Sequence, residues 1–148
     1  MSSLALPNTD KKVAVVSFGG LTTSFSVTTG EGLDQYHGGG RGQALIYWAE
    51  ATFKAATAIT SLTWKIQLGN SLTNVATATA TDWFDLPLTT IPGVTAVDQV
   101  ITAVAGATVP WPVYCPTAHL GRKFFRLVVK IAGGPSAAGD AFNCWGPG

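Results

Sequence analysis

The residue types that most often carry catalysis are few in this chain and lie far apart. The two histidines, His37 and His119, belong to neither an HExxH nor an H-x-E arrangement, and no GxSxG nucleophile motif occurs. Asp82 and Asp85 form a close pair of carboxylates, which could act in glycoside hydrolysis or bind calcium. Two aromatic residues lie between them, so a strand or turn with two solvated acids is the favoured interpretation. The sequence therefore predicts no catalytic residues and a protein that is not an enzyme.

The sequence also lacks the motifs typical of metal-binding, redox and phosphate-binding sites. Cys115 and Cys144 form no CxxC or CxxH spacing, so we expect no metal site and no cofactor. The N-terminal residues show no signal-peptide pattern, which favours synthesis in the cytoplasm and two buried free thiols over a Cys115–Cys144 disulfide. Residues 30–42, GEGLDQYHGGGRG, fit neither a P-loop nor a dinucleotide-binding turn, because a strand-like run follows them and the last required glycine is missing. We expect a mobile contact loop there.

Composition restricts the possible partners. Lys and Arg number 9 and Asp and Glu number 8, a balance that argues against a nucleic-acid-binding protein. Residues 99–121 contain no charged side chain, but Pro110, Pro112 and Pro116 would break a helix that crossed a membrane, so no membrane association is predicted. Charged residues make up 11% of the chain, against about 25% in an average soluble domain. We therefore expect part of the surface to be covered in the working state, with a somewhat hydrophobic solitary domain as the alternative.

The elements that would position any site are mostly strands. With 148 residues the chain fits a single domain, which we expect at 13–148 after an N-terminal arm at 1–12. The clearest strand is 62–68, where Leu62, Trp64, Ile66 and Leu68 alternate with polar residues and predict a core face. Residues 123–132 predict a second strand, with an apolar face of Phe125, Leu127, Val129 and Ile131 and a mixed opposite face.

The secondary structure of the other segments is less clearly indicated. Residues 44–53 fit both a strand and a helix, and their aromatic and β-branched residues favour the strand. Residues 74–81 predict an outer strand, with a Thr/Ala loop as the alternative, and the proline-rich 110–115 predicts an edge strand. Residues 95–105 predict the one helix, which begins with a capping-box pattern. Further strands are expected at 13–18, 24–28 and 139–144, and together these segments predict an all-β fold, an antiparallel sandwich or barrel.

Aromatic residues are the best candidates for contacts with other molecules. Trp64 is expected on a core face, and Trp48 with it. Trp111 lies between two prolines and Trp145 lies near the C-terminus, positions that favour the surface. Because aromatic residues are enriched at protein interfaces, we expect Trp111, Tyr114 and Trp145 to lie near interfaces, with ordinary core packing as the alternative.

The order of the segments resembles a known family. A glycine-rich stretch precedes the strand at 44–53, an alternating strand at 62–68 ends in a polar loop, and Ile91-Pro92 follows. The sequence RKFFRLVVKI at 122–131 then leads into Gly-Gly and an Ala/Gly-rich turn. In this order the chain resembles the jelly-roll cement (decoration) proteins of tailed-bacteriophage capsids, over roughly residues 30–144. The proline-rich stretch at 110–116 and the long N-terminal segment depart from the family pattern.

This resemblance implies a fold, a location and partners. The fold would be a jelly-roll-like antiparallel β-sandwich of one domain. The protein would be a structural virion protein that sits on the outer capsid surface as a homo-oligomer, a dimer or trimer. It would bind the phage major capsid protein and stabilise the shell. The alternatives are a jelly-roll carbohydrate-binding or host-attachment module of a virion and, less favoured, a small hydrolase of unrecognised type.

Overall fold

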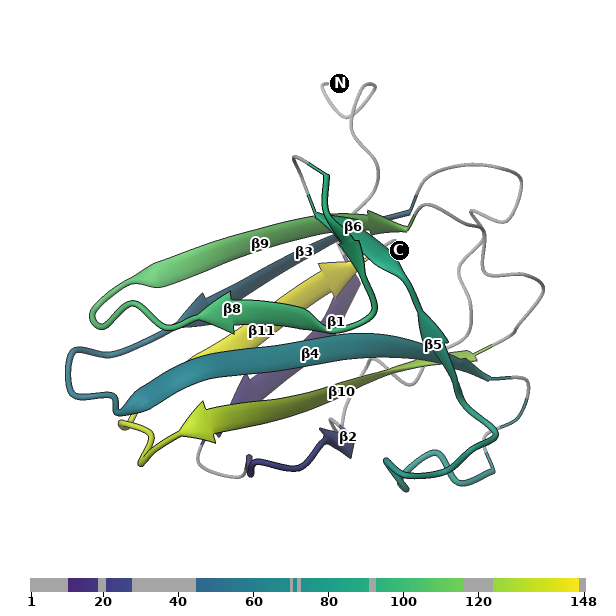
Figure 1. Cartoon of the computed structure of the whole chain (residues 1–148), viewed down its shortest axis with the longest axis horizontal. Coiled ribbons are helices and arrows are strands. Elements are labelled where there is room, and N and C mark those ends of the chain that lie inside the picture. Colours follow the sequence, from purple (N-terminus) through teal and green to yellow (C-terminus); the bar gives the residue numbers. More distant parts are fainter. Residues whose placement is uncertain are drawn as a thin grey trace.

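The computed structural model describes residues 11–18, 21–27, 45–69, 71, 73–90, 93–115 and 124–146. Within these ranges the protein is all-β, and its strands form two antiparallel sheets that pack face to face (Figure 1). The predicted antiparallel sandwich is confirmed. The predicted loop at 30–42 lies outside the described residues, as does the predicted arm at 1–12 apart from Lys11 and Lys12, which already belong to the first strand.

The two sheets contain six and five strands. The first sheet consists, in spatial order, of β1 (Lys11–Ser17), β11 (Ala141–Gly146), β3 (Leu45–Thr52), β9 (Thr108–Cys115), β6 (Leu88–Thr90) and β7 (Thr95–Ala96). The second consists of β2 (Ser26–Val27), β10 (Phe124–Gly133), β4 (Ile59–Gly69) and β5 (Phe84–Leu86), with β8 (Gln99–Thr102) also paired to β4. β8 and β5 share one edge of β4, because β8 pairs with residues 61–64 and β5 with residues 66–68.

The chain crosses from one sheet to the other at most steps. Without the short strands β5, β6 and β7, the spatial orders are β1-β11-β3-β9 and β2-β10-β4-β8. Strands β1 to β4 therefore alternate between the sheets, and strands β8 to β11 do so again. Figure 1 shows β9, β3, β11 and β1 as one layer and β4 with β10 as the other. Each layer thus joins segments from both ends of the chain.

β4 and β10 form the central pair of the second sheet, and each has one apolar face. They pair along their whole length, from Phe124 opposite Gly69 to Gly133 opposite Ile59. Leu62 and Trp64 on β4 are fully buried, as is Leu127 on β10. The core face predicted for 62–68 is confirmed.

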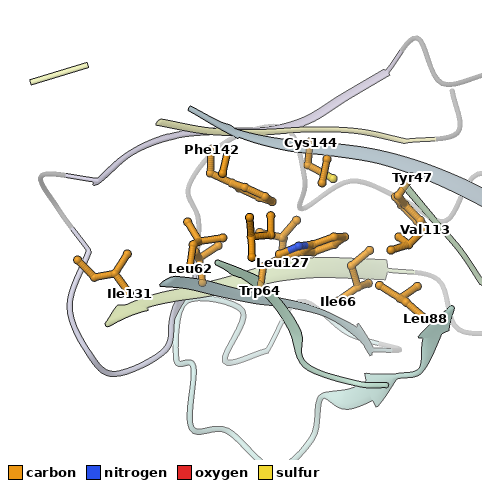
Figure 2. Packing of buried hydrophobic residues seen from close by; sticks show 14 of the residues in the cluster. Tyr47, Leu62, Trp64, Ile66, Leu88, Val113, Leu127, Ile131, Phe142 and Cys144 are labelled. Carbon is orange, nitrogen blue, oxygen red and sulfur yellow. The ribbon is translucent and has the colours of Figure 1, made fainter. Parts of the chain in front are cut away.

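Trp64 is the largest fully buried side chain. Its ring lies 5.6 Å from the ring of Phe142, which belongs to the facing sheet. Figure 2 shows Trp64 between the two layers, with Leu127 and Cys144 nearby. The indole Nε1 of Trp64 has no hydrogen-bond partner, so this side chain stabilises the fold through packing alone.

The helix predicted at 95–105 is wrong. Residues there form β7 and β8, and on β8 the side chains of Gln99 and Ile101 are buried while Val100 is exposed, a period of two. The threonine expected to cap the helix, Thr95, instead shares a hydrogen bond of 2.7 Å with the hydroxyl of Thr89 on β6. Pairing of β8 with β4 decides the outcome, because β-branched residues pack well on a pleated surface.

Two predicted strands also differ from the structure. Residues 74–81 form successive turns rather than an outer strand, with Thr77 donating from its backbone to the Asn74 carbonyl and Ala80 to the Thr77 carbonyl. Strand β9 was predicted as an edge strand, yet it has β3 on one side along its length and β6 on the other side at Val113 and Tyr114. The prolines of β9 lie at 110 and 112, outside the stretch that β6 covers, where a missing N–H group costs no ladder bond.

Candidate functional site

The outer face of the six-stranded sheet carries Trp48, the one exposed aromatic residue among the described side chains of β3, β4, β9, β10 and β11. On β3, Tyr47 and Ala49 point into the core and are fully buried. Successive side chains of a strand point to opposite faces. Trp48 therefore points outward, and it is 42% exposed. The predicted core position of Trp48 is wrong, although the strand itself was predicted correctly.

Strand register aligns Trp48 with other apolar residues across this face. Trp145 on β11 is directly opposite Trp48, and Pro112 on β9 is opposite Trp48 on the other side. We call these three residues, all of which retain exposure, the tryptophan row. Neighbouring strands lie about 4.8 Å apart, so the row forms a continuous apolar strip across β11, β3 and β9.

A second row of residues lies beside the tryptophan row. Two residues along each strand, Asn143 is opposite Glu50, and Glu50 is opposite Pro110. Further along, the hydroxyls of Thr52 and Thr108 lie 3.0 Å apart. The face thus places one carboxylate and one amide next to two indole rings. Such a surface can contact a protein, or stack a sugar ring and bind its hydroxyls.

The three residues predicted near interfaces do not lie together. Trp145 belongs to the tryptophan row, and Tyr114 lies on the same outer face, because its neighbour Val113 is fully buried. Trp111 points into the sandwich, where it packs against the core and donates from Nε1 to the side-chain oxygen of Gln99 at 3.0 Å. Trp48 is the residue that sequence reasoning missed on this face. The alternation of Leu45, Tyr47, Ala49 and Ala51 on one side of the strand was the signal that could have placed it.

The outer face of the five-stranded sheet is different, because the chain covers much of it. Arg126 on β10 points outward yet is fully buried. Its Nε donates to the side-chain oxygen of Gln67 at 2.8 Å. Its Nη1 donates to the backbone carbonyls of Asn74, Val75 and Thr77 at 3.0–3.1 Å. These carbonyls belong to the segment mispredicted as a strand, and Arg126 holds that segment against the sheet.

An indole ring completes the environment of this guanidinium. The Arg126 guanidinium lies 4.6 Å from the ring of Trp83, a cation–π contact, and Trp83 donates from Nε1 to the Thr73 carbonyl at 3.1 Å. Burial lowers the pKa of Arg126, while the charges of Asp82 and Asp85 act in the opposite direction. An arginine pKa starts so high that the group stays charged, and its donors remain available to the carbonyls.

The carboxylate pair considered for catalysis is engaged in structural contacts. Asp85 forms an ion pair with Lys65 at 3.1 Å and accepts a hydrogen bond from the Gln67 amide at 2.9 Å. Asp82 is exposed and accepts from the Asn74 amide at 3.4 Å. Asp85 lies on β5 and Asp82 in the turn before it, and both side chains are exposed, which agrees with the interpretation of a strand or turn with two solvated acids.

Asp140 is a buried carboxylate that joins neighbouring loops. It accepts hydrogen bonds from the Lys54 backbone N–H at 2.7 Å, the Thr57 hydroxyl at 2.6 Å and the Ala137 backbone N–H at 2.7 Å. Burial alone would raise its pKa, but these hydrogen bonds outweigh burial and place the pKa of Asp140 below its ordinary value. The ionised form is therefore the one that fits this site.

The register excludes a disulfide between the two cysteines. Cys144 is opposite Ala49 and Cys115 is opposite Leu45, on the two sides of β3. Two strand spacings and four residues separate them, or roughly 16 Å, whereas a disulfide needs α-carbons within about 7 Å. Cys144 is a buried free thiol, and burial raises its pKa.

No known family model, curated protein or solved structure matches this chain. Among the described residues, no group of three or more His, Cys, Asp or Glu side chains is arranged to hold a metal ion. The same part of the chain contains no helix with the length and apolar character needed to cross a membrane.

Proposed function

We propose that this protein is a capsid cement protein, a structural virion protein that binds the outside of a phage capsid as a homo-oligomer. Its partner would be the major capsid protein, and its effect would be to stabilise the shell. The observation that carries the proposal is the outer face of the six-stranded sheet, where Trp48 is 42% exposed and Trp145 and Pro112 are partly exposed. Exposed tryptophans in a protein so poor in charge favour a surface that other protein chains cover.

The strand order supports the family part of the proposal. Two four-stranded sheets in which strands β1 to β4 and β8 to β11 alternate fit a jelly roll, with β5, β6 and β7 as an insertion between β4 and β8. This is the fold implied by the sequence resemblance. We therefore propose the jelly roll together with the capsid function.

Multivalency explains how such a protein could stabilise a shell through modest contacts. An oligomer that binds neighbouring capsid subunits makes its second contact at high effective concentration. Rupture of the shell would then require several contacts to break together.

Shells with and without the protein test this function. Shells that lack it should lose DNA at a lower temperature, and addition of the purified protein should restore both binding and thermal stability. The proposal is wrong if stripped shells keep their stability and do not bind the protein in co-sedimentation.

One observation favours a second candidate, a carbohydrate-binding or host-attachment module. Trp48 and Trp145 lie beside the amide of Asn143 and the carboxylate of Glu50, an arrangement that can stack a sugar ring and bind its hydroxyls. Titration of soluble oligosaccharides against intrinsic tryptophan fluorescence distinguishes the two candidates. Saturable quenching that Trp48→Ala abolishes would favour the module, and no response together with shell binding would favour the cement protein.

A further inference from the structure

We propose that Trp48, Trp145 and Glu50 bind an arginine side chain of the partner protein, whose guanidinium stacks on an indole ring and pairs with the carboxylate. The inference rests on the proposed function in taking a protein as the partner of this face. It goes further in naming the chemical group that the partner presents there.

Glu50 is a carboxylate without a counter-ion on an otherwise uncharged face. Among the described side chains that point outward on β11, β3 and β9, it is the one that carries a charge. Its register partners, Asn143 and Pro110, are neutral, and no described residue forms an ion pair with it. On the other sheet, by contrast, Asp85 pairs with Lys65 at 3.1 Å. The charge of Glu50 is therefore available to a second molecule.

The positions of the indole rings and the carboxylate match the shape of a guanidinium. Trp48 and Glu50 are two residues apart on one face of β3, so their α-carbons lie about 6.6 Å apart. A cation is attracted to an indole face within about 6 Å of the ring centre. Because the guanidinium is planar, it can stack on a ring while its N–H groups form a bidentate pair with a carboxylate. Trp145, opposite Trp48, adds a second ring.

The five-stranded sheet contains the same combination, with the arginine supplied by the chain itself. The guanidinium of Arg126 lies 4.6 Å from the ring of Trp83. The charges of Asp82 and Asp85 raise the pKa of Arg126 against the effect of burial, so these carboxylates favour its charged form. β3, β9 and β11 contain no Lys or Arg. These strands thus offer the rings and the carboxylate but not the cation.

Charge complementarity favours arginine over other groups that a protein partner could present. A purely apolar surface would bury the Glu50 carboxylate without a partner, which costs free energy, and an acidic surface would be repelled. The ammonium of lysine is more strongly hydrated and cannot form a bidentate pair. Lysine is also depleted at protein interfaces, whereas arginine and tryptophan are enriched there.

Titration with N-acetyl-arginine amide, followed by the indole N–H signals in NMR spectra, tests the site without any shell. The signals of Trp48 and Trp145 should shift, whereas N-acetyl-citrulline amide, which has a similar shape without the charge, should not move them. Glu50→Gln should weaken binding of the arginine amide about 3-fold. Asp98→Asn is the matched control, since Asp98 is exposed in the bend between β7 and β8, and it should have no effect.

Three results of this titration would overturn the proposal. They are no shift with the arginine amide, equal shifts with the two amides, and an equal effect of Glu50→Gln and Asp98→Asn. Lys12→Met is a further control, because Lys12 is the register partner of Trp145 on β1. If the arginine amide binds only to the Lys12→Met protein, a cation of this chain competes for the site and the proposal is wrong.

Phage shells stripped of the protein test the same group on the proposed partner. Binding in co-sedimentation should be lost when shell arginines are blocked with phenylglyoxal and retained when shell lysines are acetylated. Glu50→Gln should weaken binding to untreated shells about 10-fold or more, because it leaves the partner's charge unpaired. Binding that survives both phenylglyoxal and Glu50→Gln would refute the arginine and leave the capsid function intact. No binding to untreated shells, with binding of the arginine amide retained, would refute the capsid function and leave the arginine site.

Discussion

Replacement of Arg126 by methionine tests whether the buried guanidinium holds the segment at 73–83. Methionine keeps much of the side-chain volume and can still pack against Trp83, so the change removes mainly the hydrogen bonds and the charge. The bond to Gln67 is buried, and a hydrogen bond from a charged donor contributes about 1.5–3 kcal/mol. The carbonyls of Asn74, Val75 and Thr77 lie in a largely exposed segment and regain water when the guanidinium is lost. Their share is therefore smaller, at about 1–2 kcal/mol.

The desolvation of the guanidinium acts against these gains. Burial lowers the pKa of Arg126, which shows that the site disfavours the charge to some degree. Since the variant no longer buries a charge, we expect a net loss of about 2–4 kcal/mol in the free energy of unfolding. Urea unfolding followed by tryptophan fluorescence measures this loss. Limited proteolysis should also show faster cleavage within residues 73–83, because the segment would detach before the sandwich unfolds.

Lys130→Met is the matched control for this prediction. Lys130 lies on the same outer face of β10 and also contacts an aromatic ring, that of Phe25, at 4.6 Å. It is partly exposed, so its loss should cost less than about 1 kcal/mol. If Arg126→Met costs no more than Lys130→Met, or if the 73–83 segment remains resistant to protease, the role assigned to Arg126 is refuted.

Three further predictions concern the core and the loops. Trp64→Ala should destabilise the protein by about 3–5 kcal/mol in urea unfolding. Trp64→Phe should cost clearly less, because the Nε1 atom that it removes has no hydrogen-bond partner. Equal losses for the two variants would contradict the packing argument. Gly133→Ala should lower the midpoint of thermal unfolding, since Gly133 has φ 79° and an added Cβ would lie 2.8 Å from the Ala58 carbonyl oxygen. An unchanged midpoint would contradict this prediction and show that the turn can relax. Asp140→Asn should cost about 1–3 kcal/mol at pH 7. Because the pKa of Asp140 is depressed in the folded protein, its contribution to stability is present above about pH 4 and is lost as the pH falls through its folded-state pKa. The free energies of unfolding of wild type and variant should therefore converge in acid. A constant difference down to about pH 2 would contradict this prediction.

The long strands β3, β4 and β10 were predictable from sequence, because the apolar residues on one of their faces recur at every second position. β4 and β10 each carry one apolar face, and burial of Leu62, Trp64 and Leu127 follows these faces. The same periodicity in 44–53 contained the information about Trp48, since Tyr47 and Ala49 occupy the opposite side. It was overlooked because a large aromatic residue is usually buried. Local pattern therefore determined the elements better than it determined which face carries each tryptophan.

The wrong predictions share a physical cause. At 95–105 a plausible helical pattern is overridden by the pairing of β8 with β4, a partner more than thirty residues away along the chain. At 74–81 the backbone carbonyls find their donors in Arg126, which lies about fifty residues further on. Neither partner can be identified from the segment itself. The Arg126 contact in particular could not be predicted, because arginine on the outer face of a strand is normally solvated.

The difference between the two outer faces connects the composition of the chain to the proposed contact. A chain with 11% charged residues has few ionic groups with which to keep both faces of a sandwich solvated. On the five-stranded sheet, the buried Arg126 and the segment it binds cover the surface from within the same chain. On the six-stranded sheet, the outer face holds Trp48 and Trp145, and Glu50 and Asn143 lie two residues away along the same two strands. The same lack of charge that predicts a covered surface thus favours this face as the one that the proposed protein contact covers.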